Sequence, residues 1–390
     1  MRQTLAADDN LPHPSPDQEP TLVVRAGSPT ALLTLVPHLL GFVPEASLVL
    51  IGVAPPRDRI RVTLRYDLPD PPETVLVADL AAHAVGVLHA QQLDAAVAVG
   101  YGPESLVTPM ASELRDAAQG YGIDLREFLR VQDGRYWSYQ CANEACCPAA
   151  GVPFEAKADP VMTAALARLG PPVLADRAAL AARVAPLDGI AAKSMRQATR
   201  RAERHVHQLL ARVRKSARLG AARQMIAAEG LNAVGSMIRT YRSGGRFTTD
   251  YQVAWITVAL RDLRVRDDAW ARMDPAHADA HQRLWTDVTR RAQPGYVAAP
   301  ASLLAFVAWQ SGDGALANVA LDRALADEPR YSMAHLLRQV ITAGTPPSLA
   351  RLPMTPEEVA ASYADLDEED ADGDHALGPD VHDPDPACEP

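Results

Sequence analysis

Three of the chain's four cysteines stand in one short stretch, where their spacing could support metal or redox chemistry. Residues 133–151 read DGRYWSYQCANEACCPAAG and include Cys141, Cys146 and Cys147. As thiolates these residues could bind Zn²⁺, although a tetrahedral site needs a fourth ligand and none stands at a usual spacing. Alternatively, Cys141 could form a disulfide with Cys146 or Cys147 and act as a redox switch. The favoured interpretation is that all three are small apolar groups buried in a loop.

The residues before the cysteines predict a β-hairpin that presents this loop. Asp133 and Gly134 form a pair typical of a two-residue type I′ turn, because both positions need a positive φ. Closing that turn pairs Arg130 with Trp137, a candidate cation–π contact. We place this hairpin where an α/β sheet ends and a helical domain begins, with its arginine and aromatic side chains facing a shared cleft.

The segment LLGFVPEAS (residues 39–47) links an expected helix to an expected strand and offers a second group of candidates. Gly41 suits the C′ position of a helix and Pro44 stiffens the turn, so the favoured interpretation is structural. The chain contains no G-x-S-x-G, G-x-G-x-x-G or Walker A motif. The functional alternative is a ligand cleft between this segment and the hairpin, lined by Glu45, Ser47, Arg135, Trp137 and Tyr139.

Two histidines have the spacing of a metal-binding helix face. His277 and His281 stand four residues apart on a helix expected to begin at Asp274 and Pro275. No glutamate completes an H-E-x-x-H arrangement, and the surrounding AHADAHQ is expected to be solvated. Metal binding here is the minor interpretation.

Positive charge gathers between residues 193 and 223, which hold ten Lys or Arg and a single acid, Glu203. Apolar residues repeat at helical spacing from Ala198 to Ala217, and a basic stripe runs beside them. This helix could follow the phosphates of a nucleic acid, but a solvated face or a docking site for the acidic tail is favoured. The nucleic-acid candidates are Arg196, Arg200, Arg201, Arg204, Arg212, Arg214, Lys215 and Arg218.

The hydrophobic pattern predicts an α/β sandwich with a mixed sheet, followed by an all-helical domain. Strand and helix signals alternate as far as the hairpin: a short strand is expected at 22–26, then a helix with Ser28 as its N-cap, then a strand at 46–54 whose continuous apolar run predicts burial on both faces. Strand signals vanish after Ala156, and the helices expected beyond it include 160–170 and 251–263. Near the C-terminus the small and apolar positions resemble a tetratricopeptide helix pair. The expected divisions are a disordered segment (1–20), the α/β domain (21–152), the helical domain (153–352) and an acidic disordered tail (353–390). The helical domain has its repeat-like end at 300–343. Within the tail, a capping box at Thr355 is expected to start a short helix.

Composition favours a soluble, cytoplasmic protein. Apolar residues make up 48% of the chain, and neither a long apolar run nor an N-terminal basic-plus-apolar segment predicts a membrane span or a signal peptide. The net charge of −10 comes from the tail, because residues 357–390 hold thirteen acidic residues and no Lys or Arg. The residues specify no cofactor and no membrane partner.

Together these features resemble the actinobacterial domain-of-unknown-function family 4192. The resemblance rests on HLLGFVPEASLVLIGV (38–53), on the stretch 133–151, on VRD (265–267) and on the repeat-like C-terminal helices. It covers residues 22–341 and implies the two-domain layout. It implies no activity, and no site residue is carried over from it.

The leading hypothesis for function is a non-enzymatic protein-interaction or regulatory protein that binds a protein partner. It rests on the repeat-like end and on the polarised charge. The first alternative is a nucleic-acid-binding protein that uses the basic helix at 193–223. The second is an enzyme with a cleft between the LLGFVP element and the hairpin with its cysteine loop.

Overall fold

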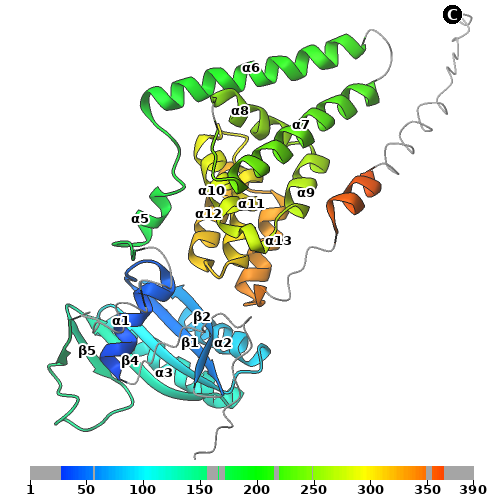
Figure 1. Cartoon of the computed structure of the whole chain (residues 1–390). Coiled ribbons are helices and arrows are strands. Elements are labelled where there is room, and N and C mark those ends of the chain that lie inside the picture. The colour runs from blue at the N-terminus through cyan, green and yellow to red at the C-terminus, as the bar shows by residue number, and fades with distance from the viewer. Residues whose placement is uncertain are drawn as a thin grey trace, which may run out of the picture.

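The chain folds into a mixed α/β part and a helical part, stacked on one another (Figure 1). The computed structural model describes residues 28–55, 58–155, 166, 172–214, 219–247, 249–347 and 354–363, with the backbone alone for 212–214 and 219–222. The expected N-terminal segment 1–20, the first expected strand and the acidic tail beyond residue 363 lie outside these residues. So does the helix expected over 160–170, apart from Leu166.

The α/β part contains a six-stranded sheet with the strand order β2-β1-β3-β4-β5-β6. Only β3 and β4 run parallel, and every other neighbouring pair is antiparallel, so the predicted mixed sheet is confirmed. The strands are β1 (Ser47–Ala54), β2 (Arg59–Asp67), β3 (Ala95–Tyr101), β4 (Asp124–Gln132), β5 (Arg135–Ser138) and β6 (Val152–Pro153).

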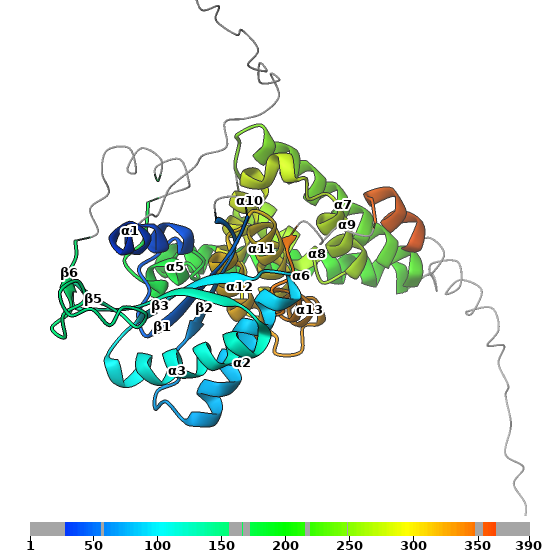
Figure 2. The same ribbon diagram turned by 90° about the horizontal axis from the view of Figure 1, so that it is seen from below.

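Helices cover both faces of this sheet (Figure 2). Leu48 and Leu50 of β1 pack on one face beneath α2 (Thr74–Ala90) and α3 (Glu104–Tyr121). Val49 and Ile51 point to the other face, which α1 (Pro29–Leu40) covers. Because successive side chains of a strand alternate between faces, a strand covered on both sides is apolar throughout, as the run in β1 predicts.

The caps predicted for α1 are confirmed. Ser28 is the N-cap, and its Oγ accepts a hydrogen bond from the backbone N–H of Ala31 at 3.2 Å. Gly41 ends the helix with φ of 76°, a left-handed conformation that glycine adopts without strain. Gly41 therefore turns the chain sharply toward β1.

The helical part is organised around α11, whose residues are buried along nearly its whole length. The helices α10, α12 and α13 pack against it, and its core is continuous with the face of the sheet under α1. The helices are α5 (Arg177–Ala182), α6 (Gly189–Arg214), α7 (Leu219–Arg242), α8 (Asp250–Ala259), α9 (Leu263–Ala271), α10 (Ala278–Arg291), α11 (Ala298–Gln310), α12 (Gly314–Asp327) and α13 (Ser332–Thr342). Among the described residues, no helix is both long and apolar enough to cross a bilayer.

The helix expected over 251–263 is shorter in the structure, and a second helix follows it. The helix α8 ends at Ala259, and α9 starts after Asp262, whose carboxylate accepts a hydrogen bond from the N–H of Arg264 at 2.9 Å. An aspartate at this position offers the backbone a new N-cap, and this local alternative interrupts the helix.

Besides the shared apolar core, hydrogen-bonded contacts between described residues connect the two parts at two places. Phe42, directly after α1, forms a backbone bridge with Leu174, directly before α5. At the other side the amide of Gln91, after α2, donates a hydrogen bond to the carbonyl oxygen of Gly344, after α13. The parts therefore meet at the LLGF element and beside Gly344. In chain order the sheet ends at the hairpin and β6, and only helices follow among the described residues, as expected.

The start of the expected disordered tail is ordered. Residues 356–363 form a helix, with the capping box of Thr355 and Glu358 present as predicted. Val359 is buried, and the Tyr363 hydroxyl donates to Asp267 of α9 at 2.7 Å. The short helix predicted within the tail is therefore confirmed, and its apolar face packs on a partner surface.

Candidate functional site

The hairpin has the predicted register. Arg130 pairs with Trp137 and Gln132 with Arg135 across a turn in which Asp133 and Gly134 have φ of 51° and 70°. The guanidinium carbon of Arg130 lies 3.6 Å from the centroid of the Trp137 ring, so the predicted cation–π contact is confirmed.

Arg130 is nevertheless only 6% exposed, and neighbouring side chains fix the position of its guanidinium group. Its Nη1 donates to Gln132 Oε1 at 3.0 Å, and its Nη2 lies 3.9 Å from the Glu104 carboxylate at the start of α3. Nearby, the hydroxyl of Tyr139 hydrogen-bonds Thr108 of α3 at 2.6 Å. Burial raises the pKa of Tyr139, and the positive charge of Arg130 opposes that rise. This cluster fastens the hairpin to α3.

Trp137 and Arg135 shape the loop that carries the cysteines. The indole Nε1 of Trp137 donates to the carbonyl oxygen of Ala149 at 3.0 Å. Arg135 Nη1 donates to the carbonyl oxygens of Ala150 and Gly151 at 3.2 and 3.0 Å. A Cβ at Gly151 would lie 2.5 Å from the Trp137 ring, so only glycine allows this close approach. These two candidates thus close the loop.

The three cysteines converge. Cys141 Sγ lies 3.0 Å from Cys146 Sγ, which lies 3.8 Å from Cys147 Sγ, and all three sulfurs are within 4.8 Å of one another. Cys146 is exposed and the other two are partly exposed, so the interpretation as buried apolar groups is wrong. Hydrogen bonding from Cys146 lowers the pKa of the Cys141 thiol, and hydrogen bonding with Cys141 raises the pKa of both neighbours.

The two candidates in the LLGFVPEAS segment do not meet the hairpin. Ser47 is fully buried, where its hydroxyl donates to the carbonyl oxygen of Glu45 and accepts from the Arg65 guanidinium at 2.8 Å. Glu45 is exposed. Because β3 and β4 lie between β1 and β5 in the sheet, the structure does not bring Ser47 and Arg135 into one cleft.

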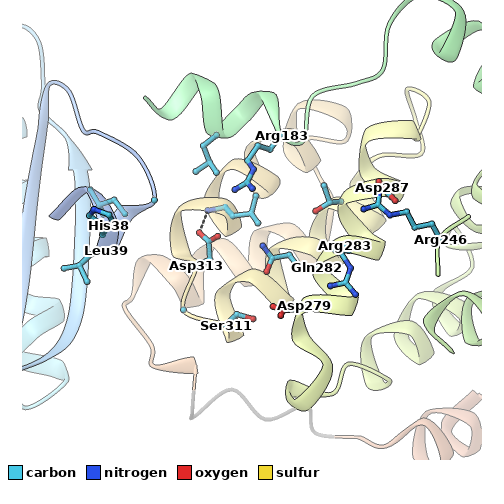
Figure 3. Close-up of a pocket in the computed structure, with 16 residues that line it drawn as sticks. His38, Leu39, Arg183, Arg246, Asp279, Gln282, Arg283, Asp287, Ser311 and Asp313 are labelled. Atoms are coloured by element: carbon cyan, nitrogen blue, oxygen red, sulfur yellow. Dashed lines mark hydrogen bonds between the residues drawn. The ribbon is translucent and has the colours of Figure 1, made fainter. Parts of the chain in front are cut away.

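A cleft of about 610 Å³ lies instead between the two parts (Figure 3). One wall is the C-terminal end of α1, and the other walls come from α5, from α10 and from the turn between α11 and α12. The polar lining residues are His38, Arg183, Arg246, Asp279, Gln282, Arg283, Thr286, Asp287, Ser311 and Asp313. None of the five residues predicted to line a ligand cleft contributes to it.

The charges of this cleft are mixed. Asp313 caps α12 by accepting from the Leu316 N–H at 2.9 Å, and burial raises the pKa of its carboxyl group. Asp287 accepts a hydrogen bond from the Tyr241 hydroxyl at 2.5 Å. Arg183 and Arg246 are exposed and form no ion pair with the described residues. Arg283 is exposed as well, so the cleft offers three exposed cations beside fixed carboxylates.

Sequence reasoning missed this cleft, although one signal pointed to it. The stretch HLLG in its wall overlaps the LLGFVP element, for which the favoured interpretation from the sequence is a helix end and a turn. The other walls come from residues 180–183, 246, 279–287 and 311–316. No local pattern joins segments so far apart in the chain.

The basic stripe predicted on α6 is exposed where the structure describes it. Arg196, Arg200 and Arg204 are exposed and form no ion pair with the described residues. Arg201 is also exposed, and its guanidinium carbon lies 5.1 Å from the centroid of the Tyr251 ring. The remaining nucleic-acid candidates, Arg212, Arg214, Lys215 and Arg218, lie outside the described side chains.

The two histidines do not form a shared metal face. His277 belongs to a short 3₁₀ helix, and its Nδ1 lies 2.8 Å from Asp274 Oδ2. His281 is 1% exposed, so the expectation of a solvated stretch is wrong at this residue. Its Nε2 accepts a hydrogen bond from the Asp274 N–H at 3.4 Å, and burial lowers its pKa to about 4. His281 is therefore a neutral core residue.

Comparison with known proteins bears on the whole of this architecture. No curated protein and no solved structure matches the chain. The family described as "Domain of unknown function (DUF4192)" matches residues 29–348, which include the LLGFVP element, the hairpin, the cysteine loop and both walls of the cleft. The protein belongs to this family.

Proposed function

We propose that the protein is a non-enzymatic binding or regulatory protein whose cleft between the two parts takes a segment of a protein partner. The observation that carries the proposal is the cleft itself, which has a volume of about 610 Å³ and is lined from both parts of the chain. Its lining joins exposed arginines to fixed carboxylates, the groups that recognise the charged side chains and backbone of a peptide.

The repeat-like helices support the same proposal. The pair α11–α12 resembles a tetratricopeptide helix pair, and its turn at Ser311, Gly312 and Asp313 lines the cleft. Stacked helix pairs of this kind offer concave surfaces to their partners. A partner bound in this cleft would contact both the α/β part and the helical part, so its affinity would depend on how the two parts are arranged.

The test measures how much of each partner protein the full chain recovers from a lysate of its own cells. The same measurement is made with a variant of the cleft and with a control variant that carries the same charge change elsewhere. Arg183→Glu with Arg246→Glu reverses two of the three exposed cations of the cleft. Arg196→Glu with Arg200→Glu makes the same charge change on the exposed face of α6. A partner that is lost at least tenfold with the first pair and retained with the second, both folded by circular dichroism, supports the proposal. Partners that the cleft pair leaves unchanged, or turnover of a small substrate by the wild type, contradict it.

A second candidate function, nucleic-acid binding, is favoured by the exposed arginines of α6. Arg196, Arg200 and Arg204 are spaced one helical turn apart and form no ion pair with the described residues, so they could contact successive phosphates. Binding of a duplex should then weaken with a log–log salt slope of about −0.9 for each contact. It should also survive deletion of residues 364–390. Binding that is absent or insensitive to salt in that truncated chain contradicts this function.

A further inference from the structure

The cysteine loop has a geometry that goes beyond the proposed partner binding. Its three sulfurs come from separate positions of the loop and still lie within 4.8 Å of one another. Zinc binds thiolate sulfur at about 2.3 Å, so a tetrahedral centre places its sulfurs about 3.8 Å apart. The Cys146–Cys147 separation of 3.8 Å already meets this spacing. The Cys141–Cys146 separation of 3.0 Å needs an opening of less than about 1 Å.

Backbone and side-chain hydrogen bonds hold the loop in this shape, and the sulfurs contribute one long bond to it, from Cys146 Sγ to the carbonyl oxygen of Asn143 at 3.5 Å. The N–H groups of Cys146 and Cys147 both donate to the carbonyl oxygen of Asn143, at 3.1 and 2.8 Å, which forms one helical turn. The Asn143 side chain accepts from the Ala145 N–H at 3.0 Å, and the Ser138 hydroxyl oxygen accepts from the Cys141 N–H at 3.1 Å. The thiols are therefore presented by a pre-organised backbone, which lowers the cost of ordering ligands around a metal.

We propose that Cys141, Cys146 and Cys147 bind one zinc ion as thiolates, with the fourth coordination position taken by water or by an added ligand. Three protein ligands and an open position form a known type of zinc site. Soft thiolates also suit iron–sulfur clusters, but those are held by four cysteines as a rule, and the loop supplies three.

A disulfide between Cys141 and Cys146 accounts for only part of the arrangement. It would use the closest pair of sulfurs and leave Cys147 without a role beside them. A divalent cation would use all three sulfurs, because it deprotonates each coordinating thiol and its positive charge offsets the repulsion between the resulting thiolates.

The first experiment measures zinc bound by the full chain, purified under reducing conditions and dialysed against Zn²⁺ alone. We expect one zinc per chain, and at least a tenfold weaker affinity in each of Cys141→Ser, Cys146→Ser and Cys147→Ser. Cys388→Ser is the matched control, since Cys388 stands outside the loop, and it should bind like the wild type. Cobalt in place of zinc should give thiolate charge-transfer bands and the intense d–d bands of a tetrahedral centre.

The second experiment needs no variant and so does not depend on whether one folds. Zinc should slow alkylation of Cys141, Cys146 and Cys147 in the wild type by at least tenfold, and should leave Cys388 unaffected, as read by peptide mass spectrometry. Three outcomes overturn the proposal: no zinc bound by the fully reduced chain, zinc retained by a variant with all three loop cysteines replaced, or equal alkylation rates with and without zinc. Each leaves the proposed partner binding at the cleft untouched.

Discussion

Phe42 and Leu174, which stand far apart in the chain, pair their backbones where the two parts meet. The Leu174 N–H donates to the carbonyl oxygen of Gly41 at 2.9 Å, and the Val43 N–H donates to the carbonyl oxygen of Leu174 at 3.1 Å. The chain leaves the sheet at β6 and returns to the LLGF element before it enters the helical part. This return places the end of α1 across the cleft from α10 and from the turn between α11 and α12.

Phe42→Ala should destabilise the protein by about 3–5 kcal/mol, because Phe42 is 2% exposed and its removal leaves a cavity at the join. The midpoint of urea unfolding measures the loss. Val43→Ala is the matched control, since Val43 is 43% exposed and its truncation should cost less than about 0.5 kcal/mol. Equal effects for the two variants would mean that the join contributes little to stability.

Gly151→Ala should destabilise the protein by about 2–4 kcal/mol, since an added Cβ meets the Trp137 ring at 2.5 Å in a left-handed conformation with φ of 76°. Gly41→Ala separates the two causes, because Gly41 has the same φ of 76° and no atom within 4 Å of the added Cβ. It should cost only about 1–2 kcal/mol. Urea unfolding of both variants, with tryptophan fluorescence as a second signal, checks the difference. A Gly151 variant no weaker than the Gly41 variant would contradict the close approach.

His281 should make stability fall as the solution is acidified. Its pKa is about 4 in the folded protein, against 6.5 for an unperturbed histidine, so the unfolded chain binds the extra proton first. The contribution is fully present above pH 6.5 and is lost as the pH falls toward 4. Its maximum is about 3 kcal/mol, since each unit of pKa difference corresponds to about 1.4 kcal/mol.

His281→Gln tests this assignment, since it removes the titrating group while keeping a side chain that can accept from the Asp274 N–H. The variant should lose most of the decline in free energy of unfolding between about pH 7 and about pH 4.5. His277→Gln, one helical turn away and partly exposed, should keep it. An unchanged pH profile in the His281 variant would assign the decline to other groups.

Tyr363→Phe should weaken the docking of the short helix at 356–363, because it removes a 2.7 Å hydrogen bond to the Asp267 carboxylate. The expected loss of stability is about 1–2 kcal/mol, since the acceptor is charged but also paired with Arg266. Hydrogen exchange should show faster exchange confined to 356–363 and α9. Ser362→Ala is the control, as its hydroxyl bonds only within this helix and its own segment.

Local patterns in the sequence predicted much of the fold. The Ser28 cap, the Gly41 helix end, the Asp133–Gly134 turn and the Thr355 capping box all form as expected. Each depends on the backbone preferences of residues within about four positions of one another, so a short stretch of sequence is enough to specify it. The apolar run of β1 also indicated correctly that both faces of its strand are covered.

Relations between distant segments were decided by the tertiary structure alone. The sequence by itself determined that three cysteines share a loop, but the turn around Asn143 and the closure by Trp137 brought their sulfurs within 4.8 Å. The sequence also determined a hairpin and an LLGFVP element. In the folded chain the strand order separates the two, and the Phe42–Leu174 bridge places the LLGFVP element where the two parts meet. The physical reason is that strand order and helix docking maximise burial over the whole chain, a quantity that no short window of residues contains.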